Sequence, residues 1–180
     1  MTIAACVLSL PERAHLLTEC LAAIHAQTRL PDDIVVGIDP YRLGEADNAN
    51  RLEQATNCDW VAWCHSDDLW HPDHLAVMEA HCADADVVVS RFDLVNRPWG
   101  SIEPWHENFE DQRFTQWIGS PSMVMTRKGT WPGWREPQHP YRWVDHTSYN
   151  VALDDGCRFV DTKTVTTDYR FMGGNGSWTP

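Results

Sequence analysis

Residues 3–39 read IAACVLSLPERAHLLTECLAAIHAQTRLPDDIVVGID. An apolar run opens this stretch at 3–10 and another closes it at 33–39, and the apolar residues between them recur at helical spacing. Continuous apolar runs of this length are typical of strands that are buried on both faces. The stretch therefore predicts a strand–helix–strand unit, which requires parallel strands and a right-handed crossover.

The alternation of strands and helices continues toward residue 95, and the rest of the chain is less regular. Further strands are predicted at 59–64, 86–92 and 122–126, with one or two more within 158–171, and further helices within 44–57, at 72–82 and at 145–154. A chain of 180 residues fits one domain. We expect an open α/β sheet, on which ligands bind at the carboxyl ends of the strands.

The composition limits the classes of partner. Acidic residues outnumber basic ones by 26 to 14, and the formal net charge of -12 argues against broad electrostatic binding to nucleic acid or to anionic membranes. No stretch approaches the ~18 apolar residues of a transmembrane helix. The N-terminus lacks the basic region of a signal peptide. We expect a cytoplasmic protein that is not inserted in a membrane.

Cysteine and tryptophan are both informative. The six cysteines form no CxxC pair and several lie in apolar runs, so we expect them to be reduced and buried, as suits the cytoplasm. The ten tryptophans crowd the middle and the C-terminal half of the chain. Most of them are expected to pack in the core and in loops, while a few would serve as flat platforms for sugar rings or bases.

The stretch WCHSDDLWHP at 63–72 carries the strongest chemical signal. Asp67 and Asp68 follow a predicted buried strand, where two adjacent carboxylates repel each other unless a cation or hydrogen-bond donors offset their charge. A divalent cation with oxygen ligands would offset it and would also hold a diphosphate. The alternative at this point is that one of the two aspartates caps the helix that follows.

A series of short motifs, taken together, resembles glycosyltransferase family 2, the inverting enzymes with the GT-A fold. In chain order the motifs are VLSLPER (7–13), QTRLP (27–31), IVVGID (34–39), NRL (50–52), HSDDLWHP (65–72), WVD (143–145) and YRFMGGNGS (169–177). The resemblance implies a Rossmann-like, open and mostly parallel sheet with helices on both faces. In this single GT-A domain of residues 1–180, residues 1–95 would bind the nucleotide-sugar, and residues 96–180 would form an irregular acceptor-binding and lid half.

The same resemblance implies a metal-dependent, inverting transfer of a sugar from a nucleoside diphosphate sugar, by default a UDP-sugar, to an acceptor hydroxyl. Asp67 would hold Mn²⁺ or Mg²⁺, which neutralises the departing diphosphate, and Arg170 would be a second cation there. Asp145 would be the base that accepts the proton of the acceptor hydroxyl, and its alternative role is an N-cap. The acceptor stays open among a glycan, a small molecule, a protein and a modified DNA base.

The motifs also imply a set of binding residues. The nucleotide-sugar would contact Ser9, Pro11, Arg13, Asp39, Arg51, His65, Ser66 and Arg170, and the platform for the sugar or acceptor would comprise Trp143, His146 and Trp178. The alternative for the polar residues at strand ends is a role as caps and in turns. Two positions depart from the family pattern. His65 replaces the first acid of the metal motif, where it would be a metal ligand or a ribose contact, and Met172 replaces a histidine of the lid. The chain is also short for the family, so that a partner subunit in an oligomer would complete the acceptor side.

Three other functions compete with this interpretation. A sugar-phosphate nucleotidyltransferase would need a Gly-rich loop after the first strand, and residues 9–13 contain no glycine. A non-catalytic protein that binds carbohydrate or nucleotide-sugar would account for the tryptophans and for the altered metal motif. A metal-dependent hydrolase would use the cluster of histidines and aspartates. Zinc bound by His65, His71 and His74 is one such site, although their spacing matches no strong zinc pattern.

Overall fold

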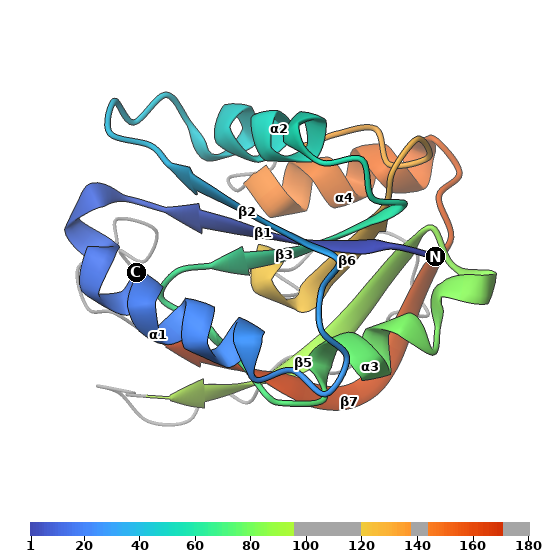
Figure 1. The fold of residues 1–180 in the computed structure, drawn as a ribbon. Helices are drawn as coiled ribbons and strands as arrows, with labels where there is room; N and C mark the ends of the chain where they lie inside the picture. Colours follow the sequence, from blue (N-terminus) through green and yellow to red (C-terminus); the bar gives the residue numbers. More distant parts are fainter. Residues whose placement is uncertain (96–119, 138–143, 171–180) are drawn as a thin grey trace.

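The computed structural model describes residues 1–95, 120–137 and 144–170. Within these residues, seven strands form one sheet in the order β2-β1-β3-β6-β5-β7-β4 (Figure 1). The strands are β1 (Ile3–Ser9), β2 (Asp33–Ile38), β3 (Trp60–His65), β4 (Leu69–Trp70), β5 (Val87–Val95), β6 (Val124–Arg127) and β7 (Phe159–Arg170). The α-helices are α1 (Ala14–His25), α2 (Glu45–Ala55), α3 (His74–Glu79) and α4 (Val144–Asp154), and the short 3-10 helices are η1 (Pro11–Arg13), η2 (Cys82–Asp84) and η3 (Pro121–Met123).

Most strands of the sheet run in the same direction. β1 pairs in parallel with β2 and β3, and β5 pairs in parallel with β7. β6 lies antiparallel between β3 and β5, so β5 and β7 run in the direction of β1. β4 is antiparallel to β7. The expected mostly parallel α/β sheet is confirmed, and β1, α1 and β2 form the strand–helix–strand unit at its start.

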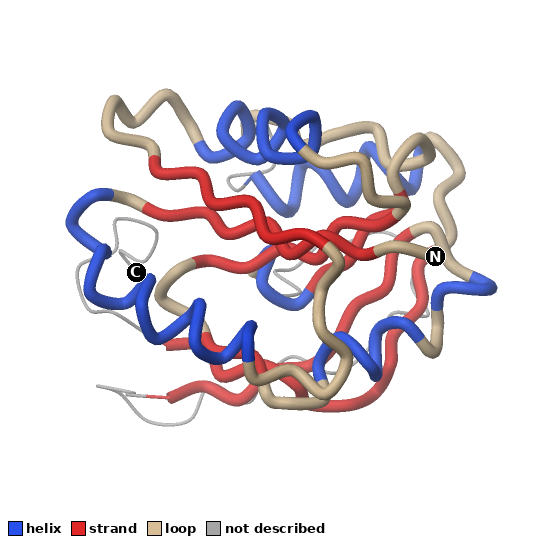
Figure 2. Tube along the Cα trace, in the orientation of Figure 1, coloured by secondary structure: helices blue, strands red, loops and turns tan. Residues whose placement is uncertain are grey.

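Helices cover both faces of this sheet, with α2 and α4 on one face and α1 and α3 on the other (Figures 1 and 2). Successive side chains of a strand point to opposite faces. β1 therefore contributes Ala4, Cys6 and Leu8 to the core under α2 and α4, and Ile3, Ala5 and Val7 to the core under α1 and α3. Every residue of β1 is buried in consequence, as its apolar sequence predicts.

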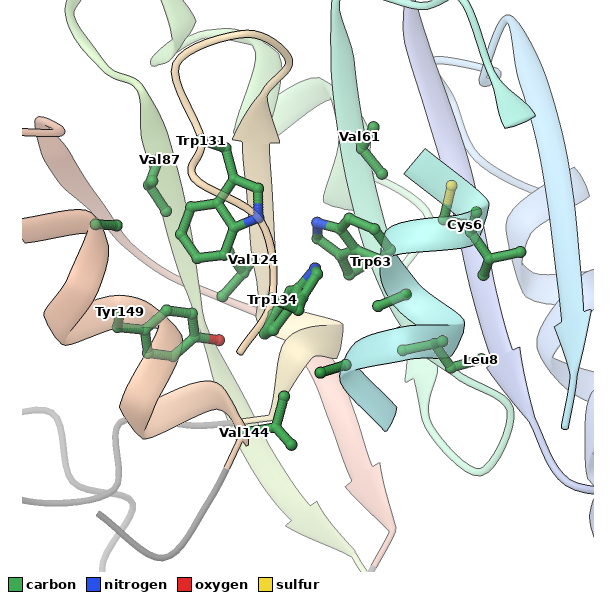
Figure 3. Packing of buried hydrophobic residues seen from close by; sticks show 14 of the residues in the cluster. Cys6, Leu8, Val61, Trp63, Val87, Val124, Trp131, Trp134, Val144 and Tyr149 are labelled. Atoms are coloured by element: carbon green, nitrogen blue, oxygen red, sulfur yellow. The ribbon is translucent and has the colours of Figure 1, made fainter. Parts of the chain in front are cut away.

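The core under α2 and α4 is built around aromatic rings (Figure 3). Trp134 packs edge-on against Trp63 and against Trp131, with 5.3 Å between ring centroids in each pair. The side chain of Asn50 on α2 holds this region in place, because it donates to the carbonyl of Trp134 at 2.9 Å and accepts from its N–H at 2.8 Å. The described tryptophans are all buried: they are Trp60, Trp63, Trp70, Trp131 and Trp134. Packing thus accounts for each tryptophan of the described residues.

Some predicted elements differ from the structure. The apolar sequence of β2 predicts a buried strand, but β2 lies at the edge of the sheet, and Val36 and Ile38 are 38% and 49% exposed. β4 is not predicted, because a strand of two residues has no periodicity to detect. The helix predicted at 72–82 is shorter, since α3 ends at Glu79 and η2 follows.

All six cysteines lie within the described residues, and each is free and buried, as expected. They behave as small apolar side chains of the two cores. No helix of the described residues is long and apolar enough to cross a membrane.

Candidate active site

A cavity of about 340 Å³ lies at the carboxyl ends of β1, β2 and β3. These three strands are parallel, so their last residues and the loops that follow gather at one edge of the sheet. The lining residues are Leu8, Ser9, Leu10, Arg13, Asp39, Arg42, Gly44, Glu45, Asn48, His65, Asp67 and Tyr169. The edge at which the strand order predicts a ligand is therefore hollowed, and its lining is rich in charged groups.

Hydrogen bonds tie the ends of these strands to one another. The N–H of Ser66 donates to the carbonyl of Leu8 at 2.9 Å, and the N–H of Asp39 donates to the carbonyl of Ser9 at 3.0 Å. The hydroxyl of Ser9 donates to Oγ of Ser66 at 2.9 Å. Ser66 is completely buried, whereas Ser9 also lines the cavity. These bonds fix the backbone from which the charged side chains of the cavity project.

The two adjacent aspartates have different partners. Oδ2 of Asp67 lies 2.8 Å from Nη1 of Arg13, and both side chains line the cavity. Asp68 points to the protein interior, where Oδ2 accepts from the hydroxyls of Ser122 at 2.5 Å and Ser120 at 3.2 Å, and Oδ1 accepts from the N–H of Arg170 at 3.1 Å. Burial and the charge of Asp67 raise the pKa of Asp68 to about 6. Asp68 therefore has a structural role, and Asp67 is the carboxylate of the pair that faces the cavity.

His65 precedes this pair and is held by a second carboxylate. Its Nε2 lies 3.0 Å from Oε1 of Glu45, the first residue of α2, and its Nδ1 lies 3.3 Å from the hydroxyl of Ser120. Burial opposes a charge on the imidazole, but Glu45 outweighs it, with help from Asp67 and Asp68, and raises the pKa of His65 to about 9. His65 is consequently a cation at neutral pH in this structure.

His65, Asp67 and Asp68 each offer a ligand atom within 4.8 Å of the others, and they form the one such group of His, Cys, Asp and Glu side chains in the part of the chain that the structure describes. Carboxylate oxygens with an imidazole nitrogen suit Mn²⁺ and similar divalent ions. The chemistry of Asp67 and His65 therefore suits a metal ion, with Asp67 on the side of the cavity, whereas both oxygens of Asp68 already accept hydrogen bonds. His65 would have to release its proton first, because a ligating histidine is neutral.

The alternatives to this metal group find less support. Neither Asp67 nor Asp68 caps α3, because the residue at its N-cap is Asp73. The three histidines of the zinc alternative do not come together: Nε2 of His71 lies 2.9 Å from Asp168, and His74 is completely buried with Nδ1 2.7 Å from the hydroxyl of Thr166. The histidine-based hydrolase therefore lacks its zinc site.

Asp39 lines the cavity but its carboxylate is engaged by the loop that follows β2. Oδ1 accepts from the N–H of Tyr41 at 3.2 Å, and Oδ2 accepts from the N–H of Gly44 at 3.3 Å. Although burial opposes the charge, these backbone donors lower the pKa of Asp39. Gly44 has a φ of 119°, which lets the loop close around the carboxylate. Asp39 thus shapes one wall of the cavity.

Asp145 lies in the first turn of α4 and is buried. Its Oδ1 accepts from the N–H of His146, which is also buried, at 2.7 Å. Asp145 and His146 are not among the residues that line the cavity, whereas Tyr169 is. Burial, followed by the charges of Asp68, Asp67 and Asp145, raises the pKa of the Tyr169 hydroxyl.

Comparison with known proteins identifies the chain. The family model described as glycosyl transferase family 2 matches residues 38–133, which is more than half of the chain and includes the strand β3 with its acidic turn. The chain belongs to glycosyl transferase family 2. A search of curated proteins found no match.

Solved structures support the GT-A fold of this chain. S. aureus TarS 1–349 in complex with UDP-GlcNAc matches with a TM-score of 0.70 at 15% identity, over 100% of this chain and 62% of that chain. A197 from STIV matches with a TM-score of 0.55 at 12% identity, over 96% of this chain and 86% of that chain. A glycosyltransferase involved in glycosylation of the major capsid of PBCV-1 matches with a TM-score of 0.50 at 13% identity, over 96% and 94% of the two chains. The chain thus spans about three fifths of the TarS structure.

Other predicted site residues lie away from the lining of the cavity. Pro11 begins η1 and is exposed, and Arg51 is exposed on α2, where its neighbour Asn50 makes the bonds to Trp134 instead. The guanidinium of Arg170 pairs with Glu19 at 2.6 Å. Trp143, Trp178 and Met172 lie outside the described residues.

The sequence does not single out Glu45, Arg42 or Tyr169 as residues of the candidate site. All three line the cavity. Glu45 and Arg42 stand in a polar segment without a motif, and they reach the cavity because α2 and the loop before it lie over the end of β3. No motif in the sequence indicates that Glu45 belongs to the site. Tyr169 does belong to a recognised motif, but the resemblance points there to its neighbour Arg170.

Proposed function

We propose that this glycosyltransferase is a metal-dependent, inverting enzyme that transfers a sugar from a UDP-sugar to an acceptor hydroxyl. The observation that carries the proposal is the cavity at the ends of β1, β2 and β3, where Asp67 and His65 lie beside the guanidinium of Arg13. Nucleoside diphosphates are dianionic or more, so a pocket for them needs cations on its wall. The crystal structures of TarS with UDP-GlcNAc and with UDP support a uridine nucleotide as the donor.

In this proposal each residue has a task in one in-line displacement. Asp145 accepts the proton of the acceptor hydroxyl as its oxygen attacks the anomeric carbon. The bond from that carbon to the diphosphate breaks on the opposite face, which inverts the configuration. Arg13 and Arg42 line the cavity and stabilise the negative charge that develops on the diphosphate. A metal ion held by Asp67, with His65 as neighbour or ligand, would supply Lewis-acid stabilisation of the same charge.

The remaining assignments are part of the same proposal. Residues 1–95 contain all but one of the residues that line the cavity and would form the donor half, and residues 96–180 would form the acceptor and lid half. His146, Trp143 and Trp178 would contact the sugar or the acceptor. The free, buried cysteines support a cytoplasmic location.

A donor screen tests the proposal. The purified chain is incubated with UDP-, GDP-, CDP- and dTDP-sugars, with Mn²⁺ or with a chelator, and release of the nucleoside diphosphate is measured. We expect metal-dependent release from a UDP-sugar. Asp145→Asn should retain UDP binding in calorimetry and lose transfer, whereas normal transfer by this variant would remove Asp145 from the role of base. Donor binding without turnover of any sugar would favour the non-catalytic alternative, and absence of both would overturn the assignment.

A further inference from the structure

The contact between Arg13 and Asp67 places a cation on the carboxylate that faces the cavity. The two groups lie 2.8 Å apart, and the side chains of Arg13 and Asp67 are 22% and 7% exposed. Arg13 ends η1, where its N–H donates to the carbonyl of Leu10 at 2.9 Å, so its backbone is fixed beside the cavity. The carboxylate that we assign to the metal ion is thus already paired with a guanidinium of the same protein.

This pairing sets a competition between two cations. A divalent ion that binds Oδ2 of Asp67 must displace Arg13 or lie next to it. If it lies next to Arg13, the metal ion and the guanidinium repel each other strongly, because both are positive and the site is partly buried. A metal ion alone therefore meets the positive charge of Arg13. A diphosphate would relieve the repulsion, because guanidinium binds phosphate oxygens in a bidentate, charge-assisted manner.

We propose that Arg13 exchanges partners during donor binding, leaving Asp67 for the diphosphate and thereby making metal binding depend on the nucleotide. This inference rests on the proposed function of the site. Metal and nucleotide are then thermodynamically coupled: whichever is bound raises the affinity for the other by the same factor. Arg13 is the residue that sets this factor, so the enzyme would bind little metal until a donor is present.

Arg42 provides a matched control for this role. It lines the same cavity and carries the same charge, but its guanidinium pairs with Glu12 at 2.5 Å, and both side chains are largely exposed. In the structure its guanidinium is paired with Glu12 and not with Asp67, so loss of Arg42 should weaken diphosphate binding without freeing a metal ligand. The two arginines therefore separate attraction for the diphosphate from competition with the metal.

The test measures Mn²⁺ binding from the electron paramagnetic resonance signal of free Mn²⁺, with and without UDP, in the wild type, Arg13→Gln and Arg42→Gln. We expect UDP to raise the Mn²⁺ affinity of the wild type by roughly tenfold or more, a usual size for coupling between sites. Arg13→Gln should bind Mn²⁺ alone about tenfold more tightly than the wild type. The factor by which UDP raises the Mn²⁺ affinity of this variant should be smaller than in the wild type by a similar amount. Arg42→Gln should bind Mn²⁺ alone as the wild type does.

The outcomes separate the inference from the proposed function. Equal affinity of the wild type and Arg13→Gln for Mn²⁺ alone would overturn the partner exchange while leaving a metal-dependent donor site in place. No UDP binding by the wild type with Mn²⁺ would overturn the proposed function itself. Should Arg13→Gln unfold, as circular dichroism would show, Arg13→Lys takes its place. Lysine keeps the charge but lacks the two parallel N–H donors with which a guanidinium binds phosphate. We therefore expect Arg13→Lys to bind Mn²⁺ weakly without UDP, and UDP to raise its Mn²⁺ affinity by less than in the wild type.

Discussion

Acidic side chains lie at both ends of the sheet, and their partners differ between the two ends. At the amino ends, each acid precedes one strand and holds the backbone next to it. Asp32 accepts from the N–H of Ile3 at 2.8 Å, and Asp59 accepts from the N–H of Thr2 at 2.8 Å. Asp86 accepts from the N–H of Arg158 at 3.0 Å. These acids fasten neighbouring strands to each other.

At the carboxyl ends, the acids divide into two groups. Asp39 and Asp68 behave as the acids of the amino ends do, because backbone N–H groups and buried hydroxyls engage their oxygens. Asp67 and Glu45 instead pair with the cationic side chains of Arg13 and His65 on the wall of the cavity. A side chain can move to a ligand, whereas a backbone donor within a strand or loop is fixed. At the amino ends, Asp32 and Asp86 also pair with arginines, Arg29 at 2.8 Å and Arg158 at 3.4 Å. A cationic partner therefore indicates function only where the pair lies on the wall of the cavity, as for Asp67 and Arg13.

The largest effect expected from this comparison is on turnover. Asp67→Asn removes the carboxylate charge that would hold the metal ion against the diphosphate, and it should lower the rate of metal-dependent UDP release by about 100-fold to 1,000-fold, the usual loss for a key electrostatic contact. Asp59→Asn at the opposite end is the matched control and should leave the rate within about twofold, with a small fall in Tm. Steady-state kinetics of the two variants measure these rates. A similar loss of rate in both variants would show that acids at the two ends of the sheet do not differ in function.

Two histidines extend the comparison to pH. His65 at the cavity is charged, whereas burial lowers the pKa of His74, in the core under α1 and α3, to about 3. His74 is neutral in the fold but protonates in the unfolded chain near its ordinary pKa of about 6.5. Its contribution to stability is therefore complete above pH ~6.5 and falls as the pH decreases toward ~3.

The fold should accordingly be sensitive to acid. Between pH ~6.5 and ~4.5, His74 should reduce the free energy of unfolding by about 2–3 kcal/mol. His74→Phe keeps a ring to stack on Trp70 and should lack this part of the pH dependence. Urea unfolding at the two pH values measures the difference, with His25→Gln, an exposed site on α1, as the control. Parallel curves for wild type and His74→Phe would show that His74 does not titrate in this range.

The pair of His65 and Glu45 gives the opposite pH dependence. Because the pKa of His65 is raised to about 9, its contribution is complete below pH ~6.5 and is lost as the pH rises through ~9. Glu45 is partly exposed, so solvent weakens the pair, and we expect a contribution of about 1–2 kcal/mol. Glu45→Gln should remove the loss of stability between pH ~6 and ~9.5. Asp47→Asn, which changes another acid in the first turn of α2, should still lose stability as the pH rises over this range. If neither variant loses stability, the pH dependence arises from charge at the helix terminus and not from the pair.

The sequence predicted those features that depend on local pattern. The apolar runs indicated the strands of the parallel half, and the strand order then placed Asp39 and the turn at 65–68 at one edge. Features that depend on the order of strands were not predictable. The exposure of β2 follows from its position at the edge of the sheet, and β4 exists because β7 passes beside it.

For a similar reason, the sequence could not predict which residues of the site pair with each other. Arg13 and Asp67 were both recognised, but their contact depends on η1 lying beside the turn after β3. Glu45 reaches His65 because α2 packs over the sheet, which Gly37 permits: a Cβ there would lie 2.7 Å from the side chain of Asn48. Residue types indicated the chemistry of this edge, and the packing of helices on the sheet decided which groups meet.

The smallest effect concerns Asp39, which the family resemblance assigned to the nucleotide and the structure places among loop amides. Asp39→Ala should lower UDP affinity by about threefold to tenfold, the equivalent of one hydrogen bond. A comparison of UDP with CDP tells the two roles apart, because uracil offers an N–H where cytosine offers an acceptor. If Asp39 orders the loop alone, both nucleotides lose affinity equally in calorimetry. If Asp39 also reads the base, the preference for UDP falls with it, and Asp39 would then join Asp67 as an acid whose partner changes when the donor binds.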